Sequence, residues 1–534
     1  MLARSLRTSH ALRSVARSLS HYPAKHDAFS MTKIVGTIGP VSENAHTTQE
    51  LTSAGLKIMR INFSHATYDE ALLRTCFVVE NIELTFRAIG MSHLRASKGV
   101  HAKQAGQEFN VRAVLLDTQG PEIRGGAFPE KKVQLVKGEK ITLTTDAQFK
   151  EASTKDILFV TYEQLPMTVK LGDTVLLDDG LISLTVESID VPARQVHCRI
   201  ENSEMLGSRK GVNLPGLVVD LPALTEKDKA DVEFGVQHDM DFIAVSFVRK
   251  PEDVLDVKDF VNSVMPKYWP ASHPAPLIIS KIENHEGVTN FDRILAVSDG
   301  IMVARGDLGV EIPMQQVLTC QKDMVSKCND IGKPVIVATQ MLESMIRNPR
   351  PTRAEILDVG NAVLDGADAV MLSGEVAQGK WPVESVKTMM SVVKEADAYT
   401  KREQYKTEAL SQQEAIARAV ATTAKSLHAA MIVVMTETGD VARLVSKHKP
   451  SVPVMCYTMS QKVGRQLQVH RGLYPIVAPS EDDMTLESAI STAKKLGWLR
   501  NGDKVVMLSS DAAKSDIGQQ FVMHVATVDE ATAN

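Results

Sequence analysis

The chain of 534 residues has few cysteines, few aromatic residues and no long apolar run. Its five cysteines are scattered without a CxxC pair, so the sequence predicts neither a disulfide framework nor a zinc site. No apolar stretch approaches the ~18–20 residues that cross a bilayer, and we expect no membrane partner. A net charge of −5 leaves no excess of lysine and arginine for a nucleic-acid backbone. What remains is the composition of a globular enzyme, long enough for roughly three domains.

The N-terminal segment, residues 1–30, differs from the rest. From Met1 to His26 it is rich in arginine and serine and contains no acidic residue. That composition is typical of a mitochondrial transit peptide, so we expect import into the organelle. The alternative is a disordered basic tail on a cytoplasmic protein, with Met31 as the true start.

Eight short apolar runs rich in β-branched residues recur between residues 32 and 372, most of them separated by amphipathic helices such as 315–330 and 382–398. The runs are Lys33–Val35, Lys57–Met59, Ala113–Leu116, Phe242–Val245, Leu277–Ile279, Ile301–Val303, Pro334–Val337 and Ala369–Leu372. Strands alternating with helices predict an α/β protein whose core is a (β/α)₈ TIM barrel, with its site at the carboxyl ends of the strands.

The barrel, residues 31–120 and 223–400, is interrupted once. Residues 121–222 hold short alternating strands (132–136, 140–143, 174–177, 183–186 and 196–200) and turn signals such as Asp179-Gly180. They predict an inserted β-barrel domain placed as a lid over the barrel mouth. After residue 400 the pattern changes again, and residues 401–534 predict a C-terminal open α/β domain. Its expected strands are 432–435, 452–457, 474–477 and 504–508.

Polar residues at the strand ends carry the chemistry. Lys281 and Glu283 are two apart in a strand and therefore share a face, and Asp307 follows the next strand. Two carboxylates beside a lysine can hold a divalent cation and a phosphate group. Structural salt bridges at the strand ends are the plainer alternative.

Other strand ends add similar groups. Arg60, Asn62 and Ser64 alternate on one face; arginine suits phosphate recognition, and amide and hydroxyl oxygens suit a hard cation. The third strand ends in Asp117-Thr118 with Arg124 beyond it. The sequence therefore predicts a small phosphorylated substrate bound together with a metal ion.

One motif is a decoy. Gly374–Lys380 has the spacing of a phosphate-binding P-loop, but Trp381 stands where serine or threonine must follow the lysine. We reject a P-loop here, so a nucleotide must be bound by other residues.

Several segments, in order along the chain, resemble the signatures of the pyruvate kinase family. They are Ser280–Asn284, Met302–Gly309, Ala338–Met345, Pro351–Glu355 and Ser373–Glu375. The resemblance runs from about Thr37 through the C-terminal domain, and the interrupted barrel is the family's architecture. It implies transfer of a phosphoryl group from phosphoenolpyruvate to ADP, giving pyruvate and ATP.

The resemblance also implies roles for site residues. Glu283 and Asp307 hold Mg²⁺ (or Mn²⁺), and Lys281 neutralises the transferring phosphoryl and the enolate. Thr339 helps to deliver a proton to the enol methylene, and Arg60 contacts the phosphate. The backbone N–H groups of Gly306 and Asp307 receive the substrate carboxylate.

Two further ligand sets follow from the same resemblance, together with assembly as a homotetramer. The nucleotide set is Asn62, His65, Arg124 and Lys210. The K⁺ set is Asn62, Ser64, Asp117 and Thr118. Glu122 matches the K⁺-requiring type of the family.

Departures from the family pattern concern regulation. Gln119 replaces a usual lysine, and Glu437 and Asp440 add negative charge where many relatives bind a sugar phosphate. We therefore expect no activation by fructose 1,6-bisphosphate. Two other functions stay open at this point: another Mg²⁺-dependent barrel, such as an aldolase or lyase, and a catalytically dead relative.

Overall fold

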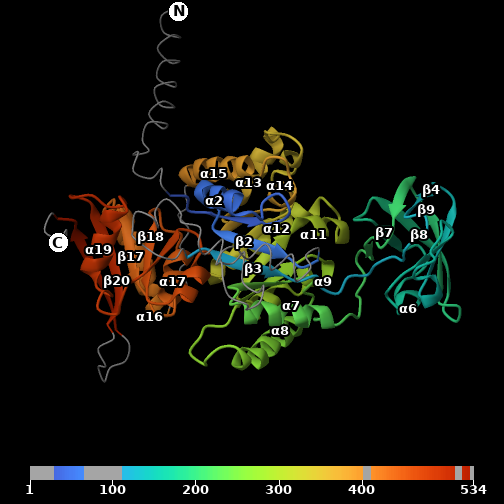
Figure 1. Ribbon diagram of the computed structural model, residues 1–534, viewed down its shortest axis with the longest axis horizontal. Coiled ribbons are helices and arrows are strands. Elements are labelled where there is room, and N and C mark those ends of the chain that lie inside the picture. Colours follow the sequence, from blue (N-terminus) through green and yellow to red (C-terminus); the bar gives the residue numbers. More distant parts are fainter. Residues whose placement is uncertain (1–28, 65–110, 401–410, 512–519, 530–534) are drawn as a thin grey trace, which may run out of the picture.

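The computed structural model describes residues 29–64, 111–400, 411–511 and 520–529. Three parts follow one another across Figure 1: the C-terminal domain, the barrel in the centre and the inserted β domain at the far end. None of the helices in these ranges is long and apolar enough to cross a bilayer.

The barrel closes as predicted. Its strands are β1 (Lys33–Thr37), β2 (Ile58–Asn62), β3 (Ala113–Asp117), β12 (Phe242–Val245), β13 (Leu277–Ile282), β14 (Gly300–Ala304), β15 (Val335–Ala338) and β16 (Ala369–Leu372). They form a closed, all-parallel barrel in the order β1-β16-β15-β14-β13-β12-β3-β2. Alternate residues face opposite sides, so Leu115 packs inside the barrel while Val114 and Leu116 pack under the helices. The prediction of these eight strands is confirmed.

Helices surround the barrel, and their ends follow from local sequence. The main ones are α2 (Ala45–Ala54), α7 (Glu226–Gln237), α8 (Pro251–Val264), α10 (Phe291–Val297), α12 (Gln316–Ile331), α13 (Arg353–Asp365) and α15 (Pro382–Tyr399). Shorter helices follow strand ends: α9 (His285–Thr289), α11 (Arg305–Glu311) and α14 (Gly374–Ala377). α13 begins in a capping box between Thr352 and Glu355 and ends at Gly366, whose φ of 112° is costly for a residue with a side chain. The predicted helices 315–330 and 382–398 correspond to α12 and α15: α12 begins and ends one residue later than predicted, and α15 ends one residue later.

The inserted domain is mainly β, with one short helix, α6 (Leu165–Thr168), and it has its own apolar core. Its strands are β4 (Lys132–Leu135), β5 (Lys140–Thr144), β6 (Ile157–Phe159), β7 (Thr174–Leu177), β8 (Ile182–Asp190), β9 (Gln195–Ile200), β10 (Glu204–Gly207) and β11 (Val212–Asn213). They form a six-stranded sheet in the order β11-β7-β8-β9-β5-β6 and a two-stranded sheet of β10 and β4. The short strands β6, β10 and β11 are additional to the sequence prediction.

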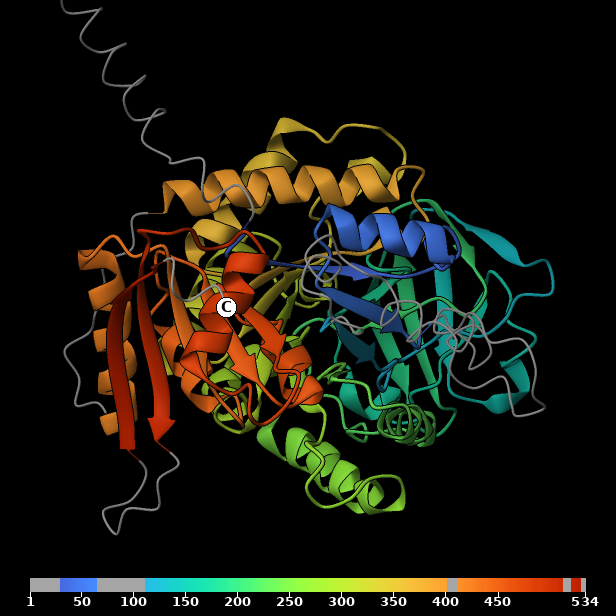
Figure 2. The same ribbon diagram turned by 60° about the vertical axis from the view of Figure 1, so that its left-hand side comes forward.

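The C-terminal domain is an open sheet with helices on its faces (Figure 2). Its strands are β17 (Met431–Met435), β18 (Val454–Thr458), β19 (Leu473–Val477), β20 (Lys504–Asp511) and β21 (Gln520–Thr527), in the order β19-β18-β17-β20-β21. Its helices are α16 (Gln412–Ser426), α17 (Asp440–Lys447), α18 (Gln461–Leu467) and α19 (Leu486–Lys495). The sequence prediction found the four parallel strands but missed β21, which pairs antiparallel with β20. The β-branched and aromatic residues of β21, among them Phe521 and Val525, are the signal that could have found it.

A buried ion-pair cluster joins the C-terminal domain to the barrel. Asp239 and Asp241 precede β12 and therefore lie at the amino end of the barrel strands. Lys462 of α18 lies 2.9 Å from Asp239 Oδ1, and Arg465 Nε lies 2.7 Å from Asp241 Oδ1. Because the predicted site is at the carboxyl ends of the strands, the C-terminal domain is attached at the opposite end of the barrel.

Candidate functional site

A cavity of about 370 Å³ lies between the carboxyl ends of the barrel strands and the inserted domain. Its lining includes Arg60, Lys281, Glu283 and Asp307 from the barrel and Arg124, Asp178, Asp179 and Lys210 from the inserted domain. A hydrogen bond of 2.7 Å from Asn213 Nδ2 of β11 to Glu311 Oε1 of α11 connects the two parts beside it. The inserted domain thus supplies one wall of the cavity, as its predicted position over the barrel mouth requires.

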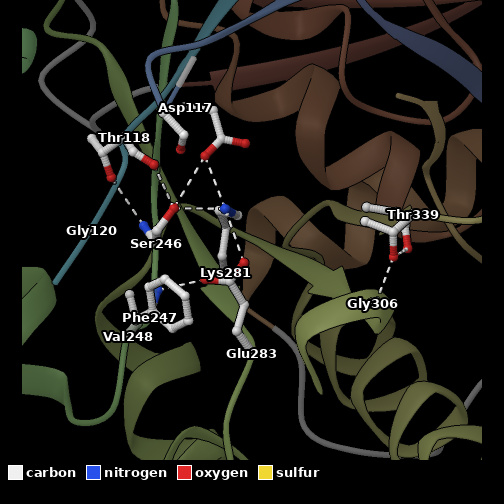
Figure 3. Close-up of polar contacts among 12 residues, drawn as sticks. Asp117, Thr118, Gly120, Ser246, Phe247, Val248, Lys281, Glu283, Gly306 and Thr339 are labelled. Atoms are coloured by element: carbon white, nitrogen blue, oxygen red, sulfur yellow. Dashed lines mark hydrogen bonds and ion pairs between the residues drawn. The ribbon is translucent and has the colours of Figure 1, made fainter. Parts of the chain in front are cut away.

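Lys281 is the centre of a buried polar cluster at the ends of β3, β12 and β13 (Figure 3). Its ammonium lies 3.0 Å from Asp117 Oδ1 and 2.9 Å from Glu283 Oε1. It also donates a hydrogen bond of 2.6 Å to Ser246 Oγ. The side chain is only 10% exposed, so these three acceptors fix the position of the ammonium.

Arg60 is held by the same carboxylate. Its Nε donates to Asp117 Oδ2 at 2.6 Å, and its Nη1 donates to Thr37 Oγ1 at 2.9 Å. Asp117 is fully buried and so connects two cations, one through each oxygen. The shared carboxylate sets the spacing of Arg60 and Lys281 at the cavity wall.

The charged groups of this cluster act on one another. Burial opposes the charge of Lys281, but Asp117 and Glu283 together outweigh it and hold its pKa above the ordinary value. Burial raises the pKa of Glu283 to about 7, Lys281 opposes the shift, and Asp307 and Asp117 add to it. Glu283 thus faces negative charge that Lys281 does not fully compensate, and a bound cation would relieve this repulsion.

Thr339 lies apart from the Lys281 cluster, next to α11 (Figure 3). Its hydroxyl accepts a 2.7 Å hydrogen bond from the backbone N–H of Gly306 and donates to Ala338 O at 2.6 Å. Thr339 and Gln340 have positive φ angles of 69° and 54°. For a β-branched residue such a backbone costs about 1–3 kcal/mol and persists only where its surroundings hold it.

The inserted domain and its hinge contribute paired cations. Lys210 Nζ lies 2.8 Å from Asp178 Oδ1. Arg124 Nε donates to Glu122 Oε2 at 2.6 Å, and its Nη2 contacts the same oxygen. Both cations line the cavity, as the sequence analysis expected for nucleotide-binding groups. His65, assigned to the same set, lies outside the described residues.

The four residues assigned to K⁺ occupy the ends of two adjacent strands. Asn62 of β2 is the register partner of Asp117 of β3. Asn62 Oδ1 accepts from Ser64 N at 3.1 Å, and Thr118 Oγ1 accepts from Ser246 N at 3.1 Å. Asn62 and Ser64 line the cavity, whereas Asp117 and Thr118 are buried behind it. Their oxygens are the hard donors that an alkali cation prefers.

Sequence reasoning missed the contribution of β12. Ser246 follows this strand directly, and its hydroxyl donates to Thr118 O at 2.6 Å while it accepts from Lys281. The next residue, Phe247, donates its N–H to Glu283 Oε2 at 2.6 Å. The signal was positional: β12 was predicted, and the residues after several other barrel strands had already been considered as ligands.

The P-loop decoy has a structural role. Gly374–Ala377 forms the short helix α14, and the buried carboxylate of Glu375 accepts from the N–H groups of Leu342 and Ser373 at 3.0 and 2.7 Å. Glu375 therefore braces the loop that follows β15.

Cations that converge on carboxylates facing a cavity are suited to moving a phosphoryl group. The fold and the site together define a phosphotransferase built on a (β/α)₈ barrel. A family model described as "Pyruvate kinase, barrel domain" matches residues 29–386, and one described as "Pyruvate kinase, alpha/beta domain" matches residues 414–519.

Curated relatives agree. A pyruvate kinase of Bacillus licheniformis is 40% identical over 511 residues, covering 94% of this chain and 81% of the relative. One of Clostridium acetobutylicum is 41% identical over 483 residues, covering 89% and 95%. One of Staphylococcus aureus (strain MRSA252) is 40% identical over 510 residues, covering 94% and 81%. The chain belongs to the pyruvate kinase family, and it transfers the phosphoryl group of phosphoenolpyruvate to ADP, giving pyruvate and ATP.

The expectation of mitochondrial import is wrong. The relatives are bacterial proteins, and bacteria have no mitochondria, so the comparisons give no support to a mitochondrial transit peptide. A short stretch rich in arginine and serine is not specific to transit peptides, and composition alone misled the prediction. Residues 1–28 lie outside the described residues.

Proposed function

We propose that the Lys281 cluster carries the phosphoryl transfer and that Thr339 serves the proton transfer that follows. The observation that carries this assignment is the buried Lys281 ammonium, held between Asp117 and Glu283 at the carboxyl ends of the strands. Glu283 is itself a proposed metal ligand, and Asp117 also holds Arg60, the proposed phosphate-binding residue.

Members of the family generally depend on Mg²⁺ and K⁺. Glu283 and Asp307 are our proposed Mg²⁺ (or Mn²⁺) ligands. In the described ranges no three His, Cys, Asp or Glu side chains form a metal-binding group. Two carboxylates nonetheless fit Mg²⁺, which takes its remaining ligands from water and substrate phosphates. The metal supplies charge neutralisation for the phosphoryl oxygens.

Phosphoryl transfer breaks the bond between phosphorus and the enolate oxygen and forms one to a terminal phosphate oxygen of ADP. Little covalent chemistry is needed from the protein, because positioning and charge stabilisation dominate. Arg60 holds the phosphoryl group of the substrate. Lys281 stabilises the charge on the transferring group and on the enolate oxygen left behind, and Asp117 keeps both cations in place.

The enolate must then gain a proton at its methylene carbon to become pyruvate. Thr339 is our proposed member of this relay, with water completing it, because its hydroxyl is already fixed by two hydrogen bonds. The N–H groups of Gly306 and Asp307 bind the substrate carboxylate. When that happens, the Gly306 N–H that now bonds Thr339 Oγ1 acquires a competing acceptor.

ADP and K⁺ complete the proposed site. Arg124 and Lys210 approach the nucleotide from the inserted domain, and both line the cavity. Asn62 and Ser64 present oxygens to the same space, and Asp117 and Thr118 complete the proposed K⁺ set behind them.

We also propose that the chain assembles as a homotetramer. Three large apolar side chains on or beside α12 and α13 are exposed in the single chain: Met314 (78%), Leu318 (62%) and Leu357 (66%). Apolar groups this exposed are suited to contact with a second copy. Sedimentation of the double variant Leu318→Glu/Leu357→Glu should give a smaller species than the unmodified chain; an unchanged tetramer would place the contacts elsewhere.

The metal assignment is tested by titrating Mn²⁺ against Glu283→Gln and Asp307→Asn, with Glu286→Gln as a matched control in the same cavity. Removing a ligand should weaken Mn²⁺ binding by about tenfold or more, because the proposed site has only two carboxylate ligands. The control should bind Mn²⁺ as the unmodified chain does. Equal affinities in all four proteins would contradict the assignment.

A further inference from the structure

Arg305 occupies a position that the proposed mechanism does not use. It is the first residue of α11, directly before Gly306, and its side chain is only 11% exposed. Its Nη2 donates to the backbone oxygen of Thr339 at 2.7 Å, and its Nε donates to Ala338 O at 3.3 Å. The guanidinium therefore grips two consecutive carbonyl groups at the end of β15.

The segment that Arg305 holds, Thr339 and Gln340, has a strained backbone. Thr339 has a φ of 69° and Gln340 one of 54°, a left-handed pair in which neither residue is glycine. Such a conformation persists only when neighbouring groups over-determine it. The Arg305 guanidinium supplies this restraint at the backbone by holding the Thr339 carbonyl. The Gly306 N–H also holds the hydroxyl at 2.7 Å, but the substrate carboxylate competes for that N–H, so the Arg305 contact is the one that persists.

Arg305 is itself anchored from behind. Its Nη1 donates to Asp358 Oδ1 of α13 at 2.8 Å and to Gln321 Oε1 of α12 at 3.4 Å. A planar guanidinium with five donors is suited to bonding several fixed acceptors at once, which an ammonium cannot do in the same geometry. Side chains of α12 and α13 thus fix the Arg305 guanidinium, which in turn fixes the backbone of Thr339.

We propose that Arg305 is a positioning residue for the proton-transfer step: it fixes the strained backbone of Thr339 so that the hydroxyl meets the methylene carbon of the enolate. The inference rests on the proposed role of Thr339. Neither Arg305 nor Thr339 is among the residues that line the cavity. The Thr339 hydroxyl bonds Gly306, which is next to the lining residue Asp307, and the Arg305 guanidinium bonds the Thr339 carbonyl, so we assign Arg305 an action through Thr339.

The plainer alternative is that Arg305 only ties α11 to α12 and α13. A tie of that kind lowers thermal stability but does not single out one chemical step. Positioning of Thr339 instead predicts a selective loss of proton transfer while the metal and the phosphate still bind. The two roles are therefore separable by an assay of the proton step alone.

That assay is the exchange of the pyruvate methyl protons with D₂O, followed by NMR with Mg²⁺, K⁺ and inorganic phosphate in place of the transferring group. Arg305→Gln should slow the exchange by about tenfold or more while the KM for phosphoenolpyruvate in the full reaction stays within about twofold. Arg305→Lys keeps the charge without the fork and should recover only part of the rate. Asp358→Asn leaves both carbonyl contacts in place and should lose less than Arg305→Gln.

The double variant Arg305→Gln/Thr339→Val separates the inference from the function it rests on. If Arg305 acts through Thr339, the double variant exchanges no more slowly than Thr339→Val alone. Unimpaired exchange in Thr339→Val would overturn the proton role of Thr339 and this inference with it. Exchange lost in Thr339→Val but kept within about twofold in both Arg305 variants would overturn the inference alone.

Discussion

Ser246 Oγ accepts a hydrogen bond of 2.6 Å from Lys281 Nζ. The same hydroxyl donates to Thr118 O at 2.6 Å and lies 3.2 Å from Asp117 Oδ1. A single serine after β12 therefore joins the lysine of β13 to the end of β3. Through it, three adjacent strands share one hydrogen-bonded cluster beneath the cavity.

Ser246→Ala should reduce turnover, because Lys281 loses one of three acceptors and can reorient. A hydrogen bond to a charged group contributes about 1.5–3 kcal/mol, so kcat should fall by about tenfold or more. Steady-state kinetics with phosphoenolpyruvate and ADP measure this. Ser263→Ala, at an exposed serine of α8, is the control and should leave kcat unchanged. Equal kcat values for the two variants would show that Ser246 does not orient the lysine.

Glu122 offers a test of the monovalent site. It lines the cavity and pairs with Arg124, and its residue type is the one associated with a K⁺ requirement. Glu122→Lys places an ammonium where, in the proposed site, a bound K⁺ would supply the charge, so activity without K⁺ should rise. We expect the ratio of rates with and without K⁺ to approach about one in this variant and to be large in the unmodified chain. A ratio that the substitution leaves unchanged would count against the K⁺ assignment.

The turn before α17 predicts how the enzyme responds to a sugar phosphate. Gly439 N already donates to Thr436 Oγ1 at 2.9 Å, and Asp440 pairs with Arg443 at 2.9 Å. A bound anion would meet Glu437 and Asp440 before it met a free helix end. Fructose 1,6-bisphosphate should therefore leave the half-saturating phosphoenolpyruvate concentration unchanged. A several-fold decrease would refute the prediction.

The ion pairs between the barrel and the C-terminal domain predict an acid-sensitive stability. Burial opposes the charge of Asp239, but Lys462 and Arg465 outweigh it and lower its pKa from 3.8 to about 2. A lowered folded-state pKa stabilises the protein above the unfolded pKa, and the contribution is lost as the pH falls toward about 2. The difference corresponds to about 2 kcal/mol.

Asp239→Asn should therefore lower the urea midpoint strongly at pH 6 and progressively less below pH 4. The exposed Asp482→Asn is the matched control and should follow the unmodified chain at every pH. A loss of stability in Asp239→Asn that does not change with pH would show that charge is not the cause.

The sequence predicted features that lie within one strand or helix and missed contacts between residues that are distant in the chain. Lys281 and Glu283 were found because the two-residue period of a strand puts them on one face, and β13 has that conformation. The barrel strands were found because each is a continuous apolar run. Ser246 was missed because one serine after such a run has no distinguishing pattern until β3 and β13 are placed beside it.

Contacts between distant segments gave no sequence signal either. Asp241 and Arg465 are separated by more than two hundred positions, and each alone reads as an ordinary surface charge. The strained φ of Thr339 was equally hidden, since threonine is not a residue that predicts a left-handed backbone. These features depend on packing between elements, which periodicity does not encode.

The most direct test of the account compares Lys281→Met with the unmodified chain in pyruvate formation from phosphoenolpyruvate and ADP, with Mg²⁺ and K⁺ present. Lys267→Met, at an exposed lysine beyond α8, is the control. If the Lys281 ammonium stabilises the transferring phosphoryl group, Lys281→Met loses about 10²–10³-fold or more in kcat while the control retains full turnover. Turnover of Lys281→Met within about tenfold of the unmodified chain would contradict the central role assigned to this lysine.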